Sequence, residues 1–147
     1  MYQISRLEKS DIDSLYILLN DIFNSGVKKE LLYNLIDNKD IIDIVCKNND
    51  IVIGHAMVEI RYDFFTGEKY FFLNYFCVDK DYRCHGIGSE LLKKLEKLAI
   101  DNDIDFMRFT SGNKRVEAHE FYKNRGYIIR DTSVFIKYFK ENLWKII

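Results

Sequence analysis

Apolar residues recur every three or four positions in four stretches of the chain, a spacing that places them on one face of an α-helix. The predicted helices cover residues 12–24, 28–36, 87–102 and 114–125. Ser10 and Asp13 have the spacing of an N-terminal capping box for the first of these helices. Gly126 follows the last helix, at the position where glycine commonly ends one.

Between and after these helices lie short apolar segments rich in β-branched and aromatic residues, which are typical of β-strands. Short turns separate the three segments in the middle of the chain and predict antiparallel hairpins over residues 43–47, 51–62 and 69–78. Further strands are expected over residues 2–6, 105–110, 127–130 and 133–138. The order β-α-α-β-β-β-α-β-α-β-β indicates an α+β fold with a mixed, mostly antiparallel central sheet flanked by helices.

Length and charge narrow the classes of function. The chain has 147 residues, and we expect a single domain over residues 1–147. A formal net charge of −1 argues against nucleic acid as a partner. We expect no membrane association, because no apolar stretch is long enough to span a bilayer and the N-terminus lacks the apolar segment of a signal peptide. The three cysteines form no C-x-x-C pair and predict free thiols in a reducing cytoplasm.

The segment VDKDYRCHGIGSELL, residues 78–92, joins a predicted strand to a predicted helix through two glycines. Such a turn presents unpaired backbone N–H groups at the positive end of the helix dipole, and glycine lets that backbone approach a ligand closely. Arg83 adds a guanidinium that can bind phosphate oxygens in a fork. The segment therefore predicts an anion site, although a simple tight turn beside a solvent-facing arginine would give the same pattern.

Two known phosphate-binding loops do not fit this segment. A dinucleotide fingerprint requires a third glycine where the chain has Leu91, and the mononucleotide loop G-x-x-x-x-G-K-[ST] is absent. The remaining pattern is R-x-x-G-x-G after a strand, which resembles the pyrophosphate-binding motif of the GNAT superfamily of N-acetyltransferases. The segment SGNKRVEAHEFYKNRGY, residues 111–127, resembles the second signature of that superfamily, a helix carrying A-x-x-F-Y.

The resemblance implies a GNAT-like (acyl-CoA N-acyltransferase) fold and the co-substrate acetyl-CoA. By resemblance, the splayed end of the fourth strand pairs with the pantetheine arm, and the glycine loop binds the pyrophosphate. The residues implied in coenzyme binding are Phe76, Cys77, Val78, Arg83, Cys84, His85, Gly86, Ile87, Gly88, Ser89 and Asn113.

For the chemistry, the resemblance places the hydroxyl of Tyr122 beside the coenzyme sulfur as a general acid. A core tyrosine with a satisfied hydroxyl is the alternative. Some members carry a basic glutamate at position 74, where this chain has Asn74, which can position an amine or a water but cannot take a proton. Lys80 replaces the usual proline, and Arg115 stands where relatives often have asparagine. If one carboxylate takes the proton instead, Glu59 and Glu117 are the first to test.

The other reactive side chains do not indicate a nucleophile, a metal site or a nucleic-acid site. Cys84 and His85 are neighbours in a loop, which rarely aligns a nucleophile with its base. The three histidines have no ligand spacing, so we expect no metal. The aromatic strand at residues 70–76 favours a central strand over a stacking platform for bases.

Three functions fit these patterns. The favoured one is transfer of an acetyl group from acetyl-CoA to a primary amine of a small molecule or peptide by direct attack. The second is a module that binds acyl-CoA without turnover, which the missing glutamate at position 74 leaves open. The third is a structural partner protein in which the glycine turn has no ligand. A homodimer also stays open.

Overall fold

The computed structural model describes residues 2–24 and 26–140. The chain divides into two compact units, Met1–Phe109 and Thr110–Ile147. In chain order the first unit contains β1 (Tyr2–Arg6), α1 (Ile12–Phe23), α2 (Lys29–Ile36), β2 (Ile41–Asn48), β3 (Ile51–Tyr62), β4 (Lys69–Val78), α3 (Ile87–Asp101) and β5 (Phe106–Arg108). Two 3₁₀ turns, Lys9–Asp11 and Lys80–Tyr82, precede α1 and α3. The second unit contains α4 (Val116–Lys123).

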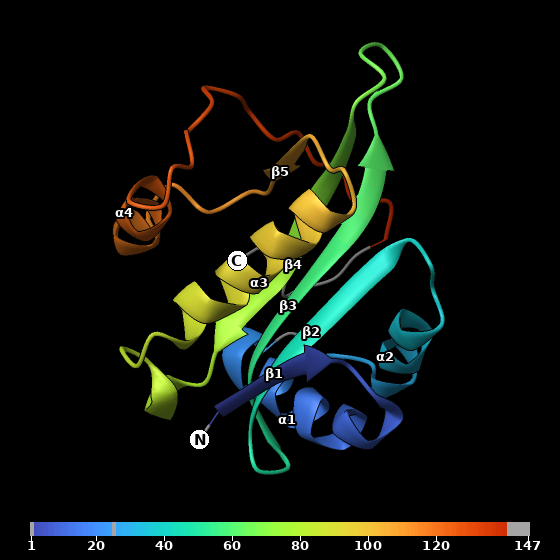
Figure 1. The fold of residues 1–147 in the computed structure, drawn as a ribbon, viewed down its shortest axis with the longest axis vertical. Coiled ribbons are helices and arrows are strands. Elements are labelled where there is room, and N and C mark those ends of the chain that lie inside the picture. The colour runs from blue at the N-terminus through green and yellow to red at the C-terminus, as the bar shows by residue number, and fades with distance from the viewer. Residues whose placement is uncertain (1, 25, 141–147) are drawn as a thin grey trace. The chain divides into compact units, whose positions relative to one another are not determined.

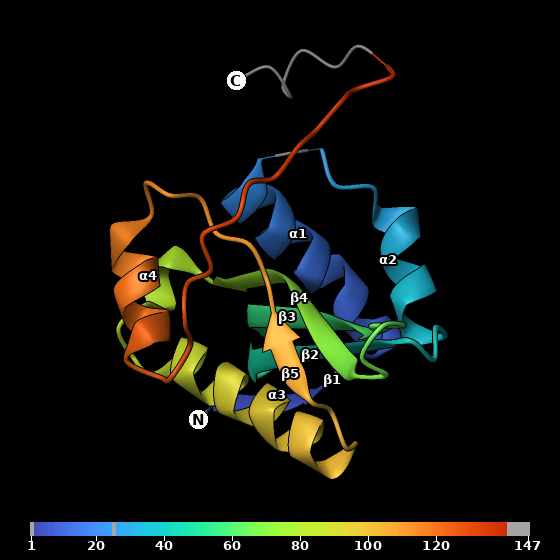
Figure 2. The same ribbon diagram turned by 90° about the horizontal axis from the view of Figure 1, so that it is seen from above.

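The first unit is built on a five-stranded sheet with the order β1-β2-β3-β4-β5 (Figure 1). The first four strands pair antiparallel, and β5 pairs parallel to β4. This arrangement confirms the expected α+β fold with a mixed, mostly antiparallel sheet. Figure 2 shows α1 and α2 over one face of the sheet and α3 over the other.

The contact between α3 and the sheet depends on a glycine in β3. A Cβ atom at Gly54 would lie 3.0 Å from Leu91 Cδ1 and 3.1 Å from Ile87 Cγ2, both on the first turns of α3. These two side chains are buried in a closely packed layer, and a side chain at position 54 would require them to give way by a few tenths of an ångström. Glycine at this position therefore lets the start of α3 lie directly on the strand.

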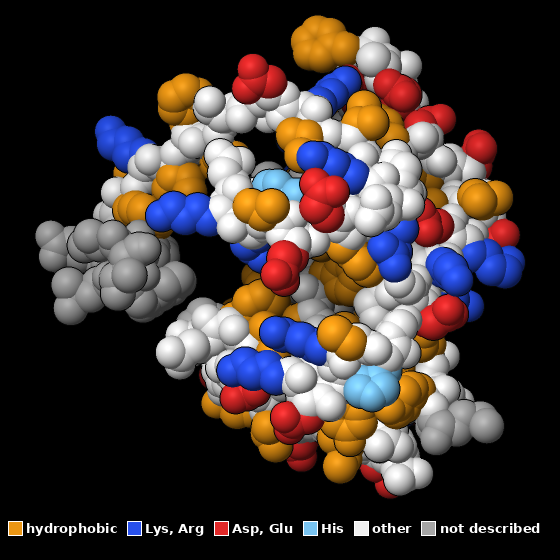
Figure 3. All heavy atoms as spheres, turned by 90° about the vertical axis from the view of Figure 1, so that its left-hand side faces the viewer, with side chains coloured by type: hydrophobic (Ala, Val, Ile, Leu, Met, Phe, Trp, Pro, Cys, Tyr) orange, Lys and Arg blue, Asp and Glu red, His pale blue; other side chains and the backbone are white. Residues whose placement is uncertain are grey.

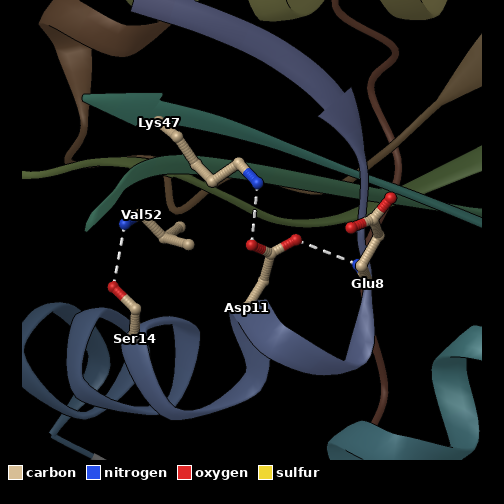
Figure 4. Close-up of polar contacts among 5 residues, drawn as sticks. All are labelled: Glu8, Asp11, Ser14, Lys47 and Val52. Carbon is tan, nitrogen blue, oxygen red and sulfur yellow. Dashed lines mark hydrogen bonds and ion pairs between the residues drawn. The ribbon is translucent and has the colours of Figure 1, made fainter. Parts of the chain in front are cut away.

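The start of α1 is fixed by polar side chains that join it to the sheet (Figure 4). The Asp11 carboxylate accepts the Glu8 N–H at 2.9 Å and pairs with Lys47 Nζ of β2 at 2.9 Å. The Ser14 hydroxyl accepts the Val52 N–H of β3 at 2.8 Å. The buried Asp11 carboxylate therefore has two functions. One oxygen caps the turn, and the other neutralises Lys47.

This arrangement corrects the capping box expected from Ser10 and Asp13. The 3₁₀ turn before α1 moves the capping interaction upstream, to Glu8 and Asp11. Asp13 lies on the exposed side of α1, where its carboxylate pairs with Lys29 instead.

The prediction of two strands over residues 127–130 and 133–138 is wrong, because neither segment is a strand in the structure. Their apolar residues, which motivated the prediction, are exposed: Ile128, Ile129, Val134, Phe135 and Ile136. Alternating apolar residues form a strand only where a partner strand supplies hydrogen bonds. Within the described part of the second unit, no segment pairs with them.

The end of α4 agrees with the prediction from Gly126. This glycine has φ +88°, its N–H donates to Lys123 O, and the Tyr127 N–H donates to Tyr122 O. These two bonds form a Schellman motif, in which a left-handed residue turns the chain out of the helix.

We predict that Asp11→Ala destabilises the protein by about 2–3 kcal/mol. The value lies below the roughly 3–5 kcal/mol for breaking a fully buried pair, since Lys47 keeps some contact with water. Urea unfolding followed by circular dichroism measures the change. Asp13→Ala is the matched control, because it removes an exposed carboxylate of the same helix and should shift the midpoint far less. Equal shifts in the two variants would contradict the role given to Asp11.

Candidate active site

The strand β4 changes its pairing halfway along its length. Residues Tyr70–Phe72 pair with β5 on one side, whereas pairing with β3 continues on the other side to Val78. No residue of β5 is paired with residues 73–78. The end of β4 therefore lies in the sheet on its β3 side and is splayed from β5 on the other, as the resemblance implied.

A β-bulge interrupts β4 in this splayed part. Asn74 is paired with Met57 and Cys77 with His55, so two residues of β4, Tyr75 and Phe76, oppose one residue of β3. Tyr75 has φ +53°, in the left-handed region that side chains other than glycine rarely adopt. The bulge redirects the backbone amides of β4 in the part that is splayed from β5.

A buried histidine contacts the bulge. His55 Nδ1 of β3 lies 2.8 Å from the Tyr75 carbonyl oxygen, and His55 Nε2 lies 2.8 Å from Asp43 Oδ1 of β2. Complete burial opposes a charge on the ring, but the Asp43 carboxylate and the Tyr75 carbonyl outweigh it and raise the pKa of His55 above its ordinary value. The sequence patterns gave this pair no role, since Asp43 and His55 are brought together only by strand pairing.

The segment after β4 forms the predicted loop without the family's usual proline. Asp79 Oδ1 accepts the Asp81 N–H at 2.9 Å, and the Tyr82 N–H donates to Asp79 O at 3.0 Å. These bonds hold the 3₁₀ turn that contains Lys80. The turn carries Arg83 back to the strand, where its Nε donates to Val78 O at 3.2 Å.

The glycine loop leads straight into α3. Cys84 has φ +65° and Gly86 φ +81°, two left-handed residues that turn the backbone before the helix. The hydrogen-bond ladder of the helix begins where the Glu90 N–H donates to Gly86 O at 3.0 Å. The amides of Ile87 and Gly88 precede that bond, at the end of the helix that attracts anions.

The predicted loop residues gather at this helix start with different degrees of exposure. Arg83, Cys84, His85 and Gly86 are exposed, and Gly88 and Ser89 are half-buried. The His85 ring is turned back on the loop, with Nδ1 3.1 Å from Tyr82 O. Ile87 is buried beside Gly54, so its backbone alone is available to a ligand in this arrangement.

The end of β4 places its own predicted residues differently. Phe76 and Val78 are half-buried, whereas Cys77 is buried in the core beneath α1. Burial raises the pKa of the Cys77 thiol to about 12, with the nearby Arg83 charge opposing the rise. The thiol therefore stays protonated at neutral pH, and Cys77 is unsuited to act as a nucleophile.

On the same strand, Asn74 is joined to a carboxylate of β3. Its Nδ2 donates to Glu59 Oε1 at 3.4 Å. The other oxygen of Glu59 accepts two bonds from Arg61, at 3.0 and 3.2 Å, and the Arg61 guanidinium lies 4.0 Å from the centre of the Phe72 ring. Position 74 lacks a carboxylate, but the neighbouring strand brings one to it.

The second unit holds the two remaining predicted residues. Tyr122 lies half-buried on α4, with its ring edge-on to Phe121 and Tyr127 at centroid distances of 5.3 and 6.0 Å. Burial raises the pKa of Tyr122, and the charge of Arg115 opposes the rise. The phenol is therefore protonated at neutral pH, as a proton donor must be. Asn113 is exposed, in the segment before α4.

Two features of other classes of protein are missing from the described residues. No three or more His, Cys, Asp or Glu side chains in residues 2–24 and 26–140 gather as metal ligands would. No helix within the same residues is long and apolar enough to cross a bilayer. Figure 3 shows Lys and Arg side chains interspersed with Asp and Glu over the face that it draws.

Known proteins resemble this chain in sequence and in fold. A human protein, "Spermidine/spermine N(1)-acetyltransferase-like protein 1", is 29% identical over 116 residues, which is 78% of this chain and 16% of that protein. The chain thus spans about a sixth of this curated relative's length. An acetyltransferase of Trypanosoma brucei has a TM-score of 0.79 and 21% identity, with 94% of this chain and 100% of the other covered.

A third similar protein was solved with a coenzyme analogue. The structure of AAC(6')-Iy in complex with a bisubstrate analogue of CoA has a TM-score of 0.81 and 14% identity, with 94% of this chain and 98% of the other covered. The family model described as "Acetyltransferase (GNAT) family" matches residues 12–127, which include both the glycine loop and α4. The chain therefore belongs to the acetyltransferase (GNAT) family, a family of acetyl-CoA-dependent enzymes, and the resemblance of its two sequence motifs is confirmed.

Proposed function

We propose that the chain transfers the acetyl group of acetyl-CoA to a primary amine of a small cationic molecule by direct attack on the thioester. One observation carries the proposal: the bulged end of β4, splayed from β5, runs within a few residues into the glycine-rich start of α3. The first feature suits an extended thiol arm, and the second suits a pyrophosphate. Coenzyme A has both groups in one molecule.

The pyrophosphate is expected at the backbone amides of residues 83–89, with Arg83 as the cationic side chain. These amides stand at the start of a 15-residue helix, whose dipole favours an anion. The pantetheine arm then extends along residues 76–78, pairing with the strand edge as an added strand would. One N–H of this edge polarises the thioester carbonyl.

The reaction needs two proton movements. The amine nitrogen forms a bond to the thioester carbon, an oxyanion develops, and the carbon–sulfur bond breaks to release the thiolate. We assign Tyr122 as the general acid that protonates the sulfur, and solvent then restores its proton. We also propose a single catalytic domain over residues 1–147. The family model supports this, because the residues that it matches, 12–127, include both the glycine loop and Tyr122.

The acceptor is expected beside Asn74 and Glu59. The Glu59 carboxylate attracts a cationic amine, and Asn74 accepts or donates a hydrogen bond next to it. The name of the human relative, which refers to spermidine and spermine, supports an acceptor of this charge. Since Arg61 holds the second oxygen of Glu59, we assign Glu59 to binding the charge and a water chain from Asn74 to removing the proton.

Three free cysteines in the described structure support the cytosol as the compartment.

One assay distinguishes the proposed acetyltransferase from a module that binds acyl-CoA without turnover. Thiol release from acetyl-CoA is measured with a panel of amines that includes spermidine and a peptide. Binding of acetyl-CoA without release for any amine would exclude the proposed transfer.

Replacement of Gly88 by valine tests the coenzyme site. A β-branched side chain at the start of α3 should block close approach of the pyrophosphate and weaken binding at least about tenfold, which corresponds to about 1.4 kcal/mol. Titration calorimetry with acetyl-CoA measures the affinity, and circular dichroism checks the fold. Lys94→Val is the control, since it introduces the same side chain at an exposed position later in the same helix. Unchanged affinity in a folded Gly88→Val protein would contradict this site.

Replacement of Tyr122 by phenylalanine tests the general acid. The variant keeps the ring and removes the proton donor, so kcat should fall by about 10²- to 10⁴-fold while the affinity for acetyl-CoA stays unchanged. Tyr127→Phe, which removes a hydroxyl from the neighbouring ring, should retain the parent rate. Parent turnover in Tyr122→Phe would leave Tyr122 a packing residue.

The pH profile of kcat/KM tests the route of the acceptor's proton. For spermidine or a lysine-like amine with a pKa of about 10.4, kcat/KM should rise about tenfold per pH unit between roughly pH 6 and 9. The reason is that the neutral amine becomes commoner and no enzyme base intervenes. Glu59→Gln should raise the KM for the amine and keep this slope. Asn74→Ala should lower the rate at every pH.

Different profiles would contradict this route. A plateau that begins near pH 7 and disappears in Glu59→Gln would make Glu59 a base. Loss of that plateau in Glu117→Gln instead, on an exposed part of α4, would make Glu117 the base. If Asn74→Ala has the parent rate and profile, the water chain does not run through Asn74.

A further inference from the structure

Two buried ionisable groups have no part in the function proposed above. The side chains of Asp43 and His55 are 3% and 1% exposed, and they lie 2.8 Å apart within the first unit. Burial of a charged pair is costly, and apolar residues of similar size would often be at least as stabilising. The position of the pair beneath the bulge in β4 suggests what it contributes instead.

Both ring nitrogens of His55 face acceptors. Nδ1 lies 2.8 Å from the Tyr75 carbonyl oxygen, which can only accept, so Nδ1 carries a hydrogen. Nε2 faces the Asp43 carboxylate, whose charge holds the ring in place from the opposite side. The pair therefore anchors one backbone carbonyl of β4 to the interior of the sheet.

That carbonyl belongs to the strained residue of the bulge. Tyr75 has φ +53°, and a side chain other than glycine keeps such a sparsely populated backbone conformation only where its surroundings hold it. Because the peptide between Tyr75 and Phe76 is planar and trans, its N–H points opposite to its carbonyl. Holding the carbonyl on His55 therefore sets the direction of the Phe76 N–H.

We propose that His55, oriented by Asp43, is a positioning residue for acetyl transfer, which fixes the peptide between Tyr75 and Phe76 in the part of β4 that is splayed from β5. The inference rests on the proposed function, in which an N–H of this edge polarises the thioester carbonyl. Preorganised donors are effective because they need not turn when the oxyanion forms. His55 supplies that preorganisation from outside the site, without contact to substrate.

The opposite assignment, a nucleophilic Cys77 activated by His55, does not fit the same geometry. Cys77 is the cross-strand partner of His55, but His55 Nδ1 is bonded to the Tyr75 carbonyl and Nε2 lies 2.8 Å from Asp43 Oδ1. The buried thiol also stays protonated at neutral pH. The His55 ring therefore holds the backbone of β4 in place and does not activate the Cys77 sulfur.

Two amide side chains of different length provide the test. In an Asp43→Asn background, which avoids a buried unpaired carboxylate, His55→Asn places an N–H donor near the position of Nδ1. His55→Gln places its amide one methylene further out, where it no longer reaches the Tyr75 carbonyl. Both variants keep a buried amide at the same position, so they differ mainly in the bond to Tyr75.

We expect the Asn variant to keep kcat within about tenfold of the parent, measured as thiol release from acetyl-CoA with spermidine as the acceptor. The Gln variant should lose about 10²- to 10³-fold, the range for one oxyanion donor. Affinity for acetyl-CoA should be the same in both, because the contact acts in the transition state. Thermal unfolding midpoints separate this loss from a loss of folded protein.

Equal kcat in the two folded variants would overturn the proposal. If the Gln variant does not fold, the same pair is compared with Tyr75→Gly added, since glycine adopts the positive φ without strain. Equal kcat values of the Asn and Gln variants in that background would overturn the proposal as well. An active parent with equal variants refutes the positioning role alone, whereas a parent that releases no thiol with any amine overturns the proposed function as well.

Discussion

The first turns of α3 lie on the backbone of β3 at Gly54, and the candidate coenzyme site depends on that contact. A side chain at Gly54 would meet Leu91 and Ile87 at about van der Waals overlap, with Cβ distances of 3.0 and 3.1 Å. These two side chains, or the helix that carries them, would then have to give way by a few tenths of an ångström. Since the loop from Val78 to Gly86 is short and internally bonded, any such movement would displace the glycine turn from the end of β4. The absence of a side chain at Gly54 thus keeps the glycine turn next to the end of β4.

The strand β4 combines two roles that are usually separate. Its first part, Tyr70–Phe72, is an interior strand with partners on both sides, and buried Phe71 fixes it in the core. Its second part is paired on the β3 side and splayed from β5 on the other. The bulge at Tyr75 lies between Asn74, which contacts Glu59, and Cys77, which is buried beneath α1. Stability comes from the first part, and the second part carries the candidate chemistry.

The sequence predicted most of the elements because their apolar residues repeat locally. The stripe of α3 and the hairpins of β2, β3 and β4 can be read from neighbouring residues, and the glycine loop has a local motif. The bulge could not be predicted, since position 75 is a tyrosine and not a glycine, and no other local signal indicates a positive φ there. The pairing of Asp43 with His55, and of Glu59 with Asn74, depends on strand register, which the order of residues does not state. Residues 127–138 show the reverse error, in which a local strand pattern has no partner strand among the described residues of its own unit.

The bulge at Tyr75 also affects what else can bind to β4. A strand edge with regularly spaced N–H and C=O groups is a template for any other extended polypeptide, and such edges promote aggregation. The extra residue at Tyr75 and Phe76 breaks the two-residue repeat, so a regular strand could match the edge on one side of the bulge but not on both. A flexible thiol arm has no such repeat to match. The irregularity at the proposed coenzyme edge thus also opposes the association of β4 with other protein chains.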